Sequence, residues 1–278
     1  WIIALNPDGK MSWNKTLGEF GYDQPVAMTS SPDGTLYFSG CLNSTSDSIF
    51  NGKAWMFSLS ASGEKAWSRT FKASVLNDIV FTENYLFSGG YIADTDGIRK
   101  PYLVKSNSSG KKVWDRQYST SGQISNLISL NDGSIAFTTG QWFGKINHDG
   151  YIAWDALLPD SCSLNYLTKS AQGNAIFAGK CGLSALLIKE FQTDGKLVSD
   201  RVLPLTSDLI LKGLYTIGNE LYLILKNEAC LGLYSIQADN SLVNKTLIQS
   251  GAISGSSEVC SDAEGKQYIL ISETDLFL

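Results

Sequence analysis

The sequence has very few of the residues on which metal and nucleophilic sites depend. It contains one histidine, His148, and five cysteines with no Cys-x-x-Cys spacing, which disfavours a zinc site or a redox motif. A Ser-His-Asp or Cys-His site would have to use His148, but this residue lies in "KINHDGY", where a hairpin turn is expected. A hairpin tip is a poor scaffold for a triad. We therefore expect no catalytic, cofactor-binding or metal-ligating residues.

Basic residues and long apolar runs are also scarce. Lysine and arginine together number 22 against 27 acidic residues, and they form no basic stripe, so nucleic acid is not expected as a partner. No run of about 18 apolar residues occurs, and we expect no insertion into a membrane. The first residue is Trp1 rather than methionine, so we expect either a removed leader or a piece of a longer polypeptide or assembly.

The most informative feature that the sequence does contain is an internal repeat. Each copy has an aromatic residue, a glycine eight positions later and a tryptophan four positions further on. The ungapped copies are Trp1–Trp13, Trp55–Trp67, Tyr102–Trp114 and Trp142–Trp154. Two weaker copies, Leu187–Ser199 and Gly232–Asn244, end in Ser199 and Asn244 instead of tryptophan. The turn glycine or asparagine supplies the positive φ of a tight hairpin, so each copy predicts an outer β-hairpin.

A second hairpin pattern alternates with the first. Its copies are Val26–Gly40, Asn77–Gly90, Asn126–Gly140, Asn165–Gly179, Lys212–Leu225 and Ser257–Ile271. Successive outer hairpins begin 40 to 54 residues apart, and no helical periodicity of useful length competes. Four short strands at this period indicate a β-propeller blade. The sequence thus predicts an all-β protein, residues 1–278, forming a single β-propeller of four-stranded antiparallel blades.

The opening segment "WIIALNPDGKMSWNKTLGEFGYDQPVAMTSSPDGTLYFSG" resembles the repeats of secreted bacterial and archaeal surface β-propellers. These are related to the quinoprotein-like (PQQ-type) propellers with tryptophan-docking repeats, and the resemblance extends to about Gly179. It implies that Trp13, Trp67, Trp114 and Trp154 pack between neighbouring blades. The residue chemistry agrees, because a tryptophan recurring once per blade serves a need shared by every blade. Stacking platforms for sugar rings are the alternative. No two cysteines are adjacent, so the quinone cofactor is not implied.

The two chain ends bear on the number of blades. The last inner hairpin, Ser257–Ile271, has no outer hairpin after it, and Trp1–Thr16 has no inner hairpin before it. Joining the two closes the ring and removes open sheet edges, which gives six blades. Thr274–Leu278 resembles the start of another outer hairpin, so a propeller of seven blades is the alternative.

Cysteines and sequons favour an extracellular or cell-surface protein. Cys162 and Cys181 flank one inner hairpin and lie almost opposite each other across its strands, which allows a disulfide, with separate buried thiols as the alternative. Asn-x-Ser/Thr sequons permit glycosylation at Asn14, Asn43, Asn107 and Asn244.

From the sequence we expect a non-catalytic secreted or cell-surface module that binds a protein or glycan through loops on one face. The longer loops Cys41–Ala54 and Tyr91–Pro101 are the candidates for that face. The alternatives are a propeller enzyme, a lyase or a glycoside-active protein, with a carboxylate and basic site in the central funnel, or an envelope assembly scaffold. No cofactor is expected.

Overall fold

The structure is a computed structural model of the 278-residue chain. It describes residues 1–18, 21–44, 52–94, 96–205, 209–227, 230–237, 240–249, 257–261 and 267–271. The chain divides into two compact units, Trp1–Asp155 and Ala156–Leu278, which are described separately below.

Every regular element in the described residues is a β-strand. The first unit contains β1 (Ile2–Leu5), β2 (Met11–Lys15), β3 (Tyr22–Ser30), β4 (Leu36–Ser44), β5 (Lys53–Leu59), β6 (Lys65–Phe71), β7 (Val75–Thr82), β8 (Tyr85–Ala93), β9 (Arg99–Asn107), β10 (Lys112–Gln117), β11 (Asn126–Ser129), β12 (Ile135–Thr138), β13 (Trp142–Ile146) and β14 (Ile152–Leu157), the last of which runs across the boundary. The second contains β15 (Cys162–Lys169), β16 (Ala175–Cys181), β17 (Ala185–Phe191), β18 (Leu197–Pro204), β19 (Ile210–Ile217), β20 (Glu220–Lys226), β21 (Cys230–Ile236), β22 (Leu242–Gln249), β23 (Ser257–Ser261) and β24 (Gln267–Ile271).

These strands form antiparallel sheets in chain order, as the alternating hairpins predict. Five sheets have four strands, β3–β6, β7–β10, β11–β14, β15–β18 and β19–β22, and two hairpins, β1–β2 and β23–β24, form two-stranded sheets. The outer-hairpin turns have the expected positive φ, for example +80° at Gly63, +76° at Gly110 and +83° at Gly150. The all-β, four-stranded antiparallel blade expected from the repeat is confirmed.

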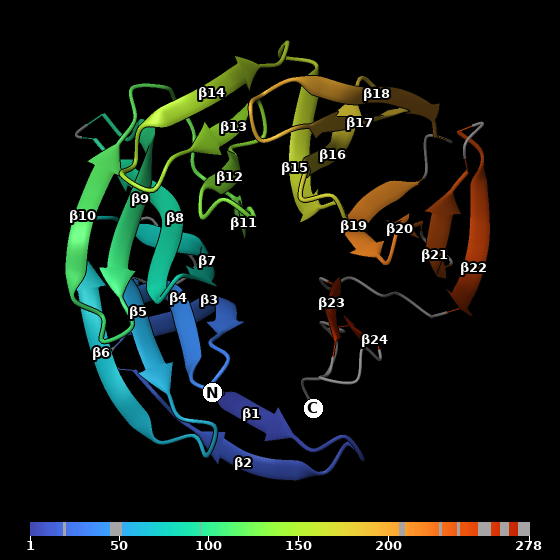
Figure 1. Cartoon of the computed structure of the whole chain (residues 1–278). Helices are drawn as coiled ribbons and strands as arrows, with labels where there is room; N and C mark the ends of the chain where they lie inside the picture. Colours follow the sequence, from blue (N-terminus) through green and yellow to red (C-terminus); the bar gives the residue numbers. More distant parts are fainter. Residues whose placement is uncertain are drawn as a thin grey trace. The chain divides into compact units, whose positions relative to one another are not determined.

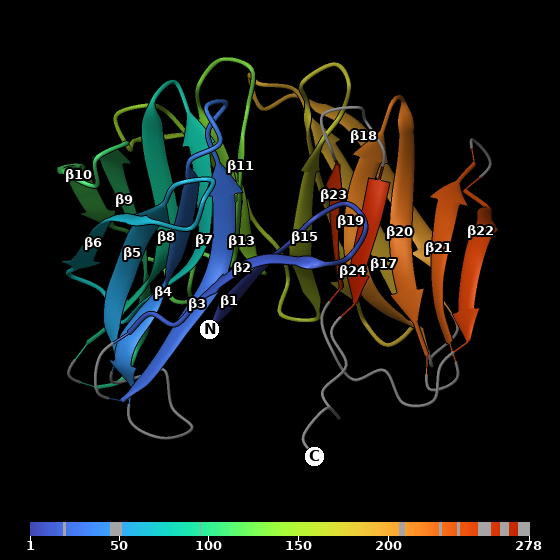
Figure 2. The same ribbon diagram turned by 90° about the horizontal axis from the view of Figure 1, so that it is seen from below.

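Within each unit, successive sheets meet through their first strands (Figures 1 and 2). In the first unit β7 contacts both β3 and β4, and β11 contacts β7; in the second, β15 contacts β19. The cores lie between neighbouring sheets. One joins Tyr37 and Trp67 of β3–β6 to Leu76 and Leu86 of β7–β10, and another joins Ile176 of β15–β18 to Leu223 of β19–β22. Stacking blades face to face around their first strands is the packing of a β-propeller.

The N-terminal hairpin lies where the outer half of a preceding blade would lie. Ile2 and Trp13 of β1–β2 pack against Phe38, Trp55 and Phe57 of the β3–β6 sheet. Its pairing with β23–β24 would join the two units, so ring closure by this hairpin stays a prediction. Thr274–Leu278, part of the Cys41–Ala54 loop (residues 45–51) and the side chain of Asn43 lie outside the described residues. The described part of the chain holds no helix long and apolar enough to cross a membrane.

Candidate functional site

Three of the four tryptophans predicted from the sequence, Trp13, Trp67 and Trp114, lie against the turn of the following sheet. Trp13 Nε1 donates to Ala61 O at 3.0 Å, and Trp67 Nε1 donates to Ser108 O at 2.9 Å. Three rings cover a turn glycine so closely that an added Cβ would lie within 3 Å of the ring: Trp13 on Gly63, Trp67 on Gly110 and Trp114 on Gly150. Trp154, the fourth, is half-buried. In three interfaces, tryptophan and glycine therefore form a matched pair.

The other predicted residues are spread over the chain. Cys162 and Cys181 are register partners in the β15–β16 pair, their Cα atoms are 4.0 Å apart, and the structure joins them in a disulfide. Asn14 and Asn244 are exposed on strands, whereas the side-chain oxygen of Asn107 accepts hydrogen bonds from the Ser109 and Lys111 backbone. Glycosylation and the oxidised state of the cysteines stay predictions. These cysteines and asparagines do not lie together in one cluster.

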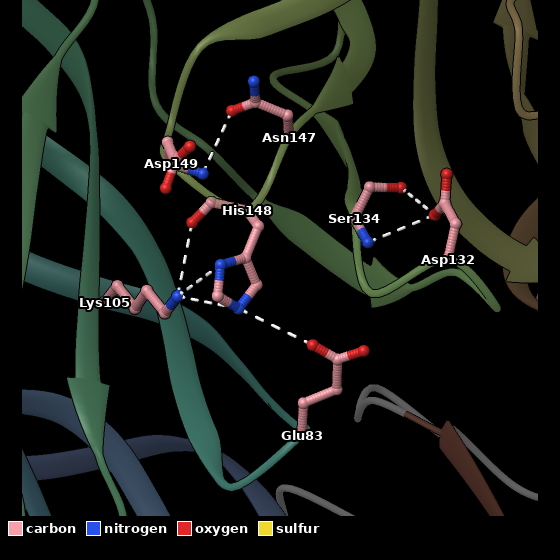
Figure 3. A network of polar contacts seen from close by, with 7 residues as sticks. All are labelled: Glu83, Lys105, Asp132, Ser134, Asn147, His148 and Asp149. Atoms are coloured by element: carbon pink, nitrogen blue, oxygen red, sulfur yellow. Dashed lines mark hydrogen bonds and ion pairs between the residues drawn. The ribbon is translucent and has the colours of Figure 1, made fainter.

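A polar cluster in the first unit brings together residues from three separate turns and strands (Figure 3). Lys105 comes from β9, Glu83 from the two-residue turn between β7 and β8, and His148 from the turn between β13 and β14. The His148 turn is held by Asn147, whose Oδ1 accepts from the backbone of Asp149 at 3.1 Å and of Tyr151 at 2.9 Å. A fixed turn gives the imidazole a fixed direction.

Lys105 is the most unusual member, because its residue is only 2% exposed. Its ammonium lies 3.9 Å from the centroid of the Tyr85 ring, a cation–π arrangement. Nζ also lies 2.9 Å from Nδ1 and 2.8 Å from Nε2 of His148, and 3.3 Å from the His148 carbonyl oxygen. Burial lowers the pKa of Lys105, an effect that the charges of Asp149 and Glu83 oppose.

His148 and Glu83 form the accessible part of the cluster. His148 Nε2 lies 3.6 Å from Glu83 Oε2, and the side chains are 40% and 59% exposed. The Tyr85 ring meets the imidazole edge-on, with the centroids 5.4 Å apart. Both ring nitrogens lie within 2.9 Å of Lys105 Nζ, and a neutral imidazole has one donor and one acceptor nitrogen, so the tautomer decides which nitrogen pairs with the amine.

In the neighbouring sheet, the lysine at the position equivalent to Lys105 forms an ordinary ion pair. Lys145 of β13 lies five residues before its turn glycine, as Lys105 does, and it is buried. Its Nζ contacts Asp132 Oδ2 at 2.5 Å, and Asp132 also accepts from the Ser134 hydroxyl. The pKa of Asp132 is lowered: burial opposes the change, and these hydrogen bonds outweigh burial. Among the described residues, Lys105 has no carboxylate within 4.0 Å, and its Nζ contacts the imidazole of His148 instead.

Sequence reasoning placed His148 on a hairpin turn, where the structure has it, but it did not find Lys105 or Glu83. The repeat holds one feature that could have identified Lys105: two consecutive copies carry a lysine five residues before the turn glycine, inside a predicted strand. A lysine at a buried strand position needs a partner, and the partner of Lys105 comes from the next copy of the repeat.

No protein-family model matches the sequence, and no curated protein matches it in sequence. Solved structures do resemble it. Periplasmic gluconolactonase from Pseudomonas aeruginosa is 15% identical with a TM-score of 0.69, and the match covers 98% of this chain and 84% of that one. Virginiamycin B lyase from Staphylococcus aureus is 12% identical with a TM-score of 0.51, covering 89% and 91%. A protein of unknown function from Bacteroides caccae is 18% identical with a TM-score of 0.51, and this chain spans 64% of its length.

These comparisons correct two expectations. The sequence suggested a non-catalytic binding or structural module and therefore no enzyme, whereas the similar structures that carry the name of an activity are enzymes, a lactonase and a lyase. That expectation took a near absence of histidine as evidence against catalysis, and a low histidine count does not by itself exclude an enzyme. At these identities the likeness establishes the fold of this chain, and that fold is a β-propeller.

Proposed function

We propose that the protein is an enzyme in which His148 acts as a general base on a neutral, sugar-derived cyclic ester, that is, a lactone. The observation that carries the proposal is the buried amine of Lys105 on the imidazole of His148, with Glu83 at its accessible edge. A buried lysine with a lowered pKa beside a histidine is typical of acid–base sites. The named activity of the gluconolactonase supports the choice of substrate class.

The proposed step is hydrolysis of the ester. With the amine of Lys105 neutral and accepting from the N–H of the ring, the unprotonated imidazole nitrogen removes a proton from water, and the water oxygen bonds to the carbonyl carbon. The ring C–O bond then breaks, and the imidazolium returns the proton to the leaving alkoxide, which gives an open-chain hydroxy acid. Each proton taken from water is thus returned to product or solvent.

Lys105 and Glu83 have different roles in this proposal. Lys105 is too deeply buried to touch substrate, so it is a positioning residue that fixes the ring and accepts a hydrogen bond from it when the amine is neutral. Glu83 is more than half exposed and lies within reach of a bound water or hydroxyl group. Two acidic groups near the site, Glu83 and Asp149, disfavour an anionic substrate and so favour a neutral lactone.

The test is proton release during hydrolysis of gluconolactone, followed at constant pH and corrected for the spontaneous reaction. We expect the wild-type protein to exceed the spontaneous rate and His148→Asn to lose about two to four powers of ten, the usual contribution of a positioned base. Thr193→Asn changes the same position of the next outer-hairpin turn and should leave the rate unchanged.

Wild-type turnover by the His148→Asn variant would refute the role of His148. Elimination from a uronate polysaccharide, seen as a new ultraviolet absorbance, with no lactone hydrolysis would instead establish the lyase activity and refute the lactonase. The same assays therefore separate the two classes of reaction.

We further propose a location outside the cytoplasm. The disulfide between Cys162 and Cys181 supports this, because such bonds persist in oxidising compartments. The name of the similar Pseudomonas enzyme, a periplasmic protein, supports it as well.

A further inference from the structure

The second unit has a cavity at the point where the repeat loses its tryptophan. Ser199 lies four residues after Gly195, the position held by Trp13, Trp67, Trp114 and Trp154 in the earlier copies. It lines a cavity of about 200 Å³ between the β15–β18 and β19–β22 sheets. Both members of the matched pair have changed here, because the turn position that is glycine in the other copies is Asn240, with a φ of +65°.

Aliphatic and polar side chains both line the cavity. The aliphatic ones are Ile176, Ile188, Leu221 and Ile236, and the Oγ1 atom of Thr216 is buried with no hydrogen-bond partner among the described residues. An aliphatic lining that also holds a buried hydroxyl suits a molecule with both C–H faces and hydroxyl groups.

The charged groups of the walls are already oriented. Glu190 Oε1 accepts from Asn174 at 2.8 Å, Glu220 Oε2 accepts from Tyr222 at 2.6 Å, and Arg201 Nε donates to Ser199 Oγ at 3.2 Å. Two carboxylates and one guanidinium line the cavity, so an anion is disfavoured. Carboxylates accept hydrogen bonds from hydroxyl groups, and the guanidinium, Gln172 and Asn219 donate to hydroxyl oxygens.

We propose that this cavity, which we call the Ser199 pocket, binds a neutral hexopyranose, either free or as the terminal residue of a glycan. The volume admits one ring and is below the range of drug-sized ligand sites. The Ser199 pocket lies in the second unit and shares no residue with the Lys105–His148 cluster. It is therefore a binding site additional to the proposed enzyme activity and independent of it.

The test is titration of the whole chain with the methyl glycosides of glucose, galactose and mannose, and with glucuronate, by ligand-observed NMR and calorimetry. At least one neutral glycoside should bind, and glucuronate should bind more weakly because of the two carboxylates. Glu190→Gln keeps the side-chain shape and removes a charged acceptor, so we expect binding about tenfold weaker. Asp194→Asn, on the exposed turn between β17 and β18 and outside the pocket lining, is the matched control and should not change affinity.

The decisive variant restores the lost pair. Ser199→Trp with Asn240→Gly should fill the pocket and abolish glycoside binding while the melting temperature stays level or rises. The glycine is needed because a Cβ at the equivalent Gly63 or Gly110 would lie 2.7–2.8 Å from the tryptophan ring. Undiminished binding by this folded double variant, or by Glu190→Gln, would overturn the proposal. So would a wild-type chain that binds none of the neutral glycosides. His148→Asn should bind as the wild type does.

Discussion

At the scale of single residues, the environment of a side chain decides its chemistry more than its identity does. Lys105 and Lys145 occupy the same position in adjacent copies, and both are buried. Lys145 meets a carboxylate and is an ordinary ion pair, whereas Lys105 meets an imidazole and an aromatic ring. Only the second arrangement leaves a desolvated amine without a compensating carboxylate within 4.0 Å among the described residues.

A pH dependence of stability follows from the lowered pKa of Lys105. Between that lowered value and 10.5, the value in the unfolded chain, the unfolded state binds more protons than the folded state, so stability rises with pH. Denaturant unfolding of the wild type and of Lys105→Met across this range measures the effect. The difference between the two proteins should change with pH in this direction, and parallel curves would contradict the prediction.

At the scale of elements, the repeat works through tryptophan and glycine together. The ring of Trp67 covers the turn between β9 and β10, and its Nε1 bonds to Ser108 in that turn. Gly110 is required for two reasons, its φ of +76° and the closeness of the Trp67 ring, whereas Gly9 is required only for its φ of +80°. Comparing substitutions at these two glycines therefore distinguishes the cost of backbone strain from the cost of losing the contact with the tryptophan ring.

Gly110→Ala should destabilise the protein more than Gly9→Ala. Both variants bear the cost of a left-handed residue, about 1–2 kcal/mol. An added Cβ at Gly110 would also lie 2.7 Å from Trp67, whereas nothing lies within 4 Å of one at Gly9. The excess, measured by denaturant unfolding, should disappear in a Trp67→Ala background. Equal costs for the two alanine variants would show that the ring does not constrain the turn.

At the scale of the whole molecule, buried tyrosine hydroxyls add polar links within and between sheets. Tyr118 donates to Gly150 O at 3.0 Å and Tyr166 donates to Leu211 O at 2.7 Å, each across an interface between sheets, while Tyr102 donates to Asp115 within its own sheet at 2.8 Å. Burial raises the pKa of all three tyrosines, and the hydrogen bond to Asp115 adds to the effect at Tyr102.

The protein should therefore lose stability steeply above pH 10.0, the ordinary tyrosine value. Above it, tyrosines ionise in the unfolded chain but stay protonated in the fold, so the folded state binds more protons and stability falls as pH rises. Unfolding followed by fluorescence on both sides of pH 10.0 measures this. Tyr118→Phe and Tyr166→Phe should each make the decline shallower, and an unchanged slope in both would refute the explanation.

The four-stranded blade follows from local features of the sequence. A glycine or asparagine at each turn and a tryptophan four residues later are local features, because turn geometry and strand alternation depend on residues close along the chain. The hairpin boundaries, the antiparallel pairing and the facing of Cys162 and Cys181 could all be predicted for that reason. The loss of the tryptophan at Ser199 could also be read from the repeat.

The Lys105–His148 cluster and the Ser199 pocket depend on contacts between sheets that are far apart along the chain. Lys105 and His148 are 43 residues apart, and the Ser199 pocket is closed by residues of two sheets. Contacts of this kind depend on how one blade stacks on the next, and no local pattern specifies which side chain meets which. The repeat places equivalent residues at equivalent positions in each sheet. The few residues that depart from the repeat determine where a polar cluster or a cavity forms.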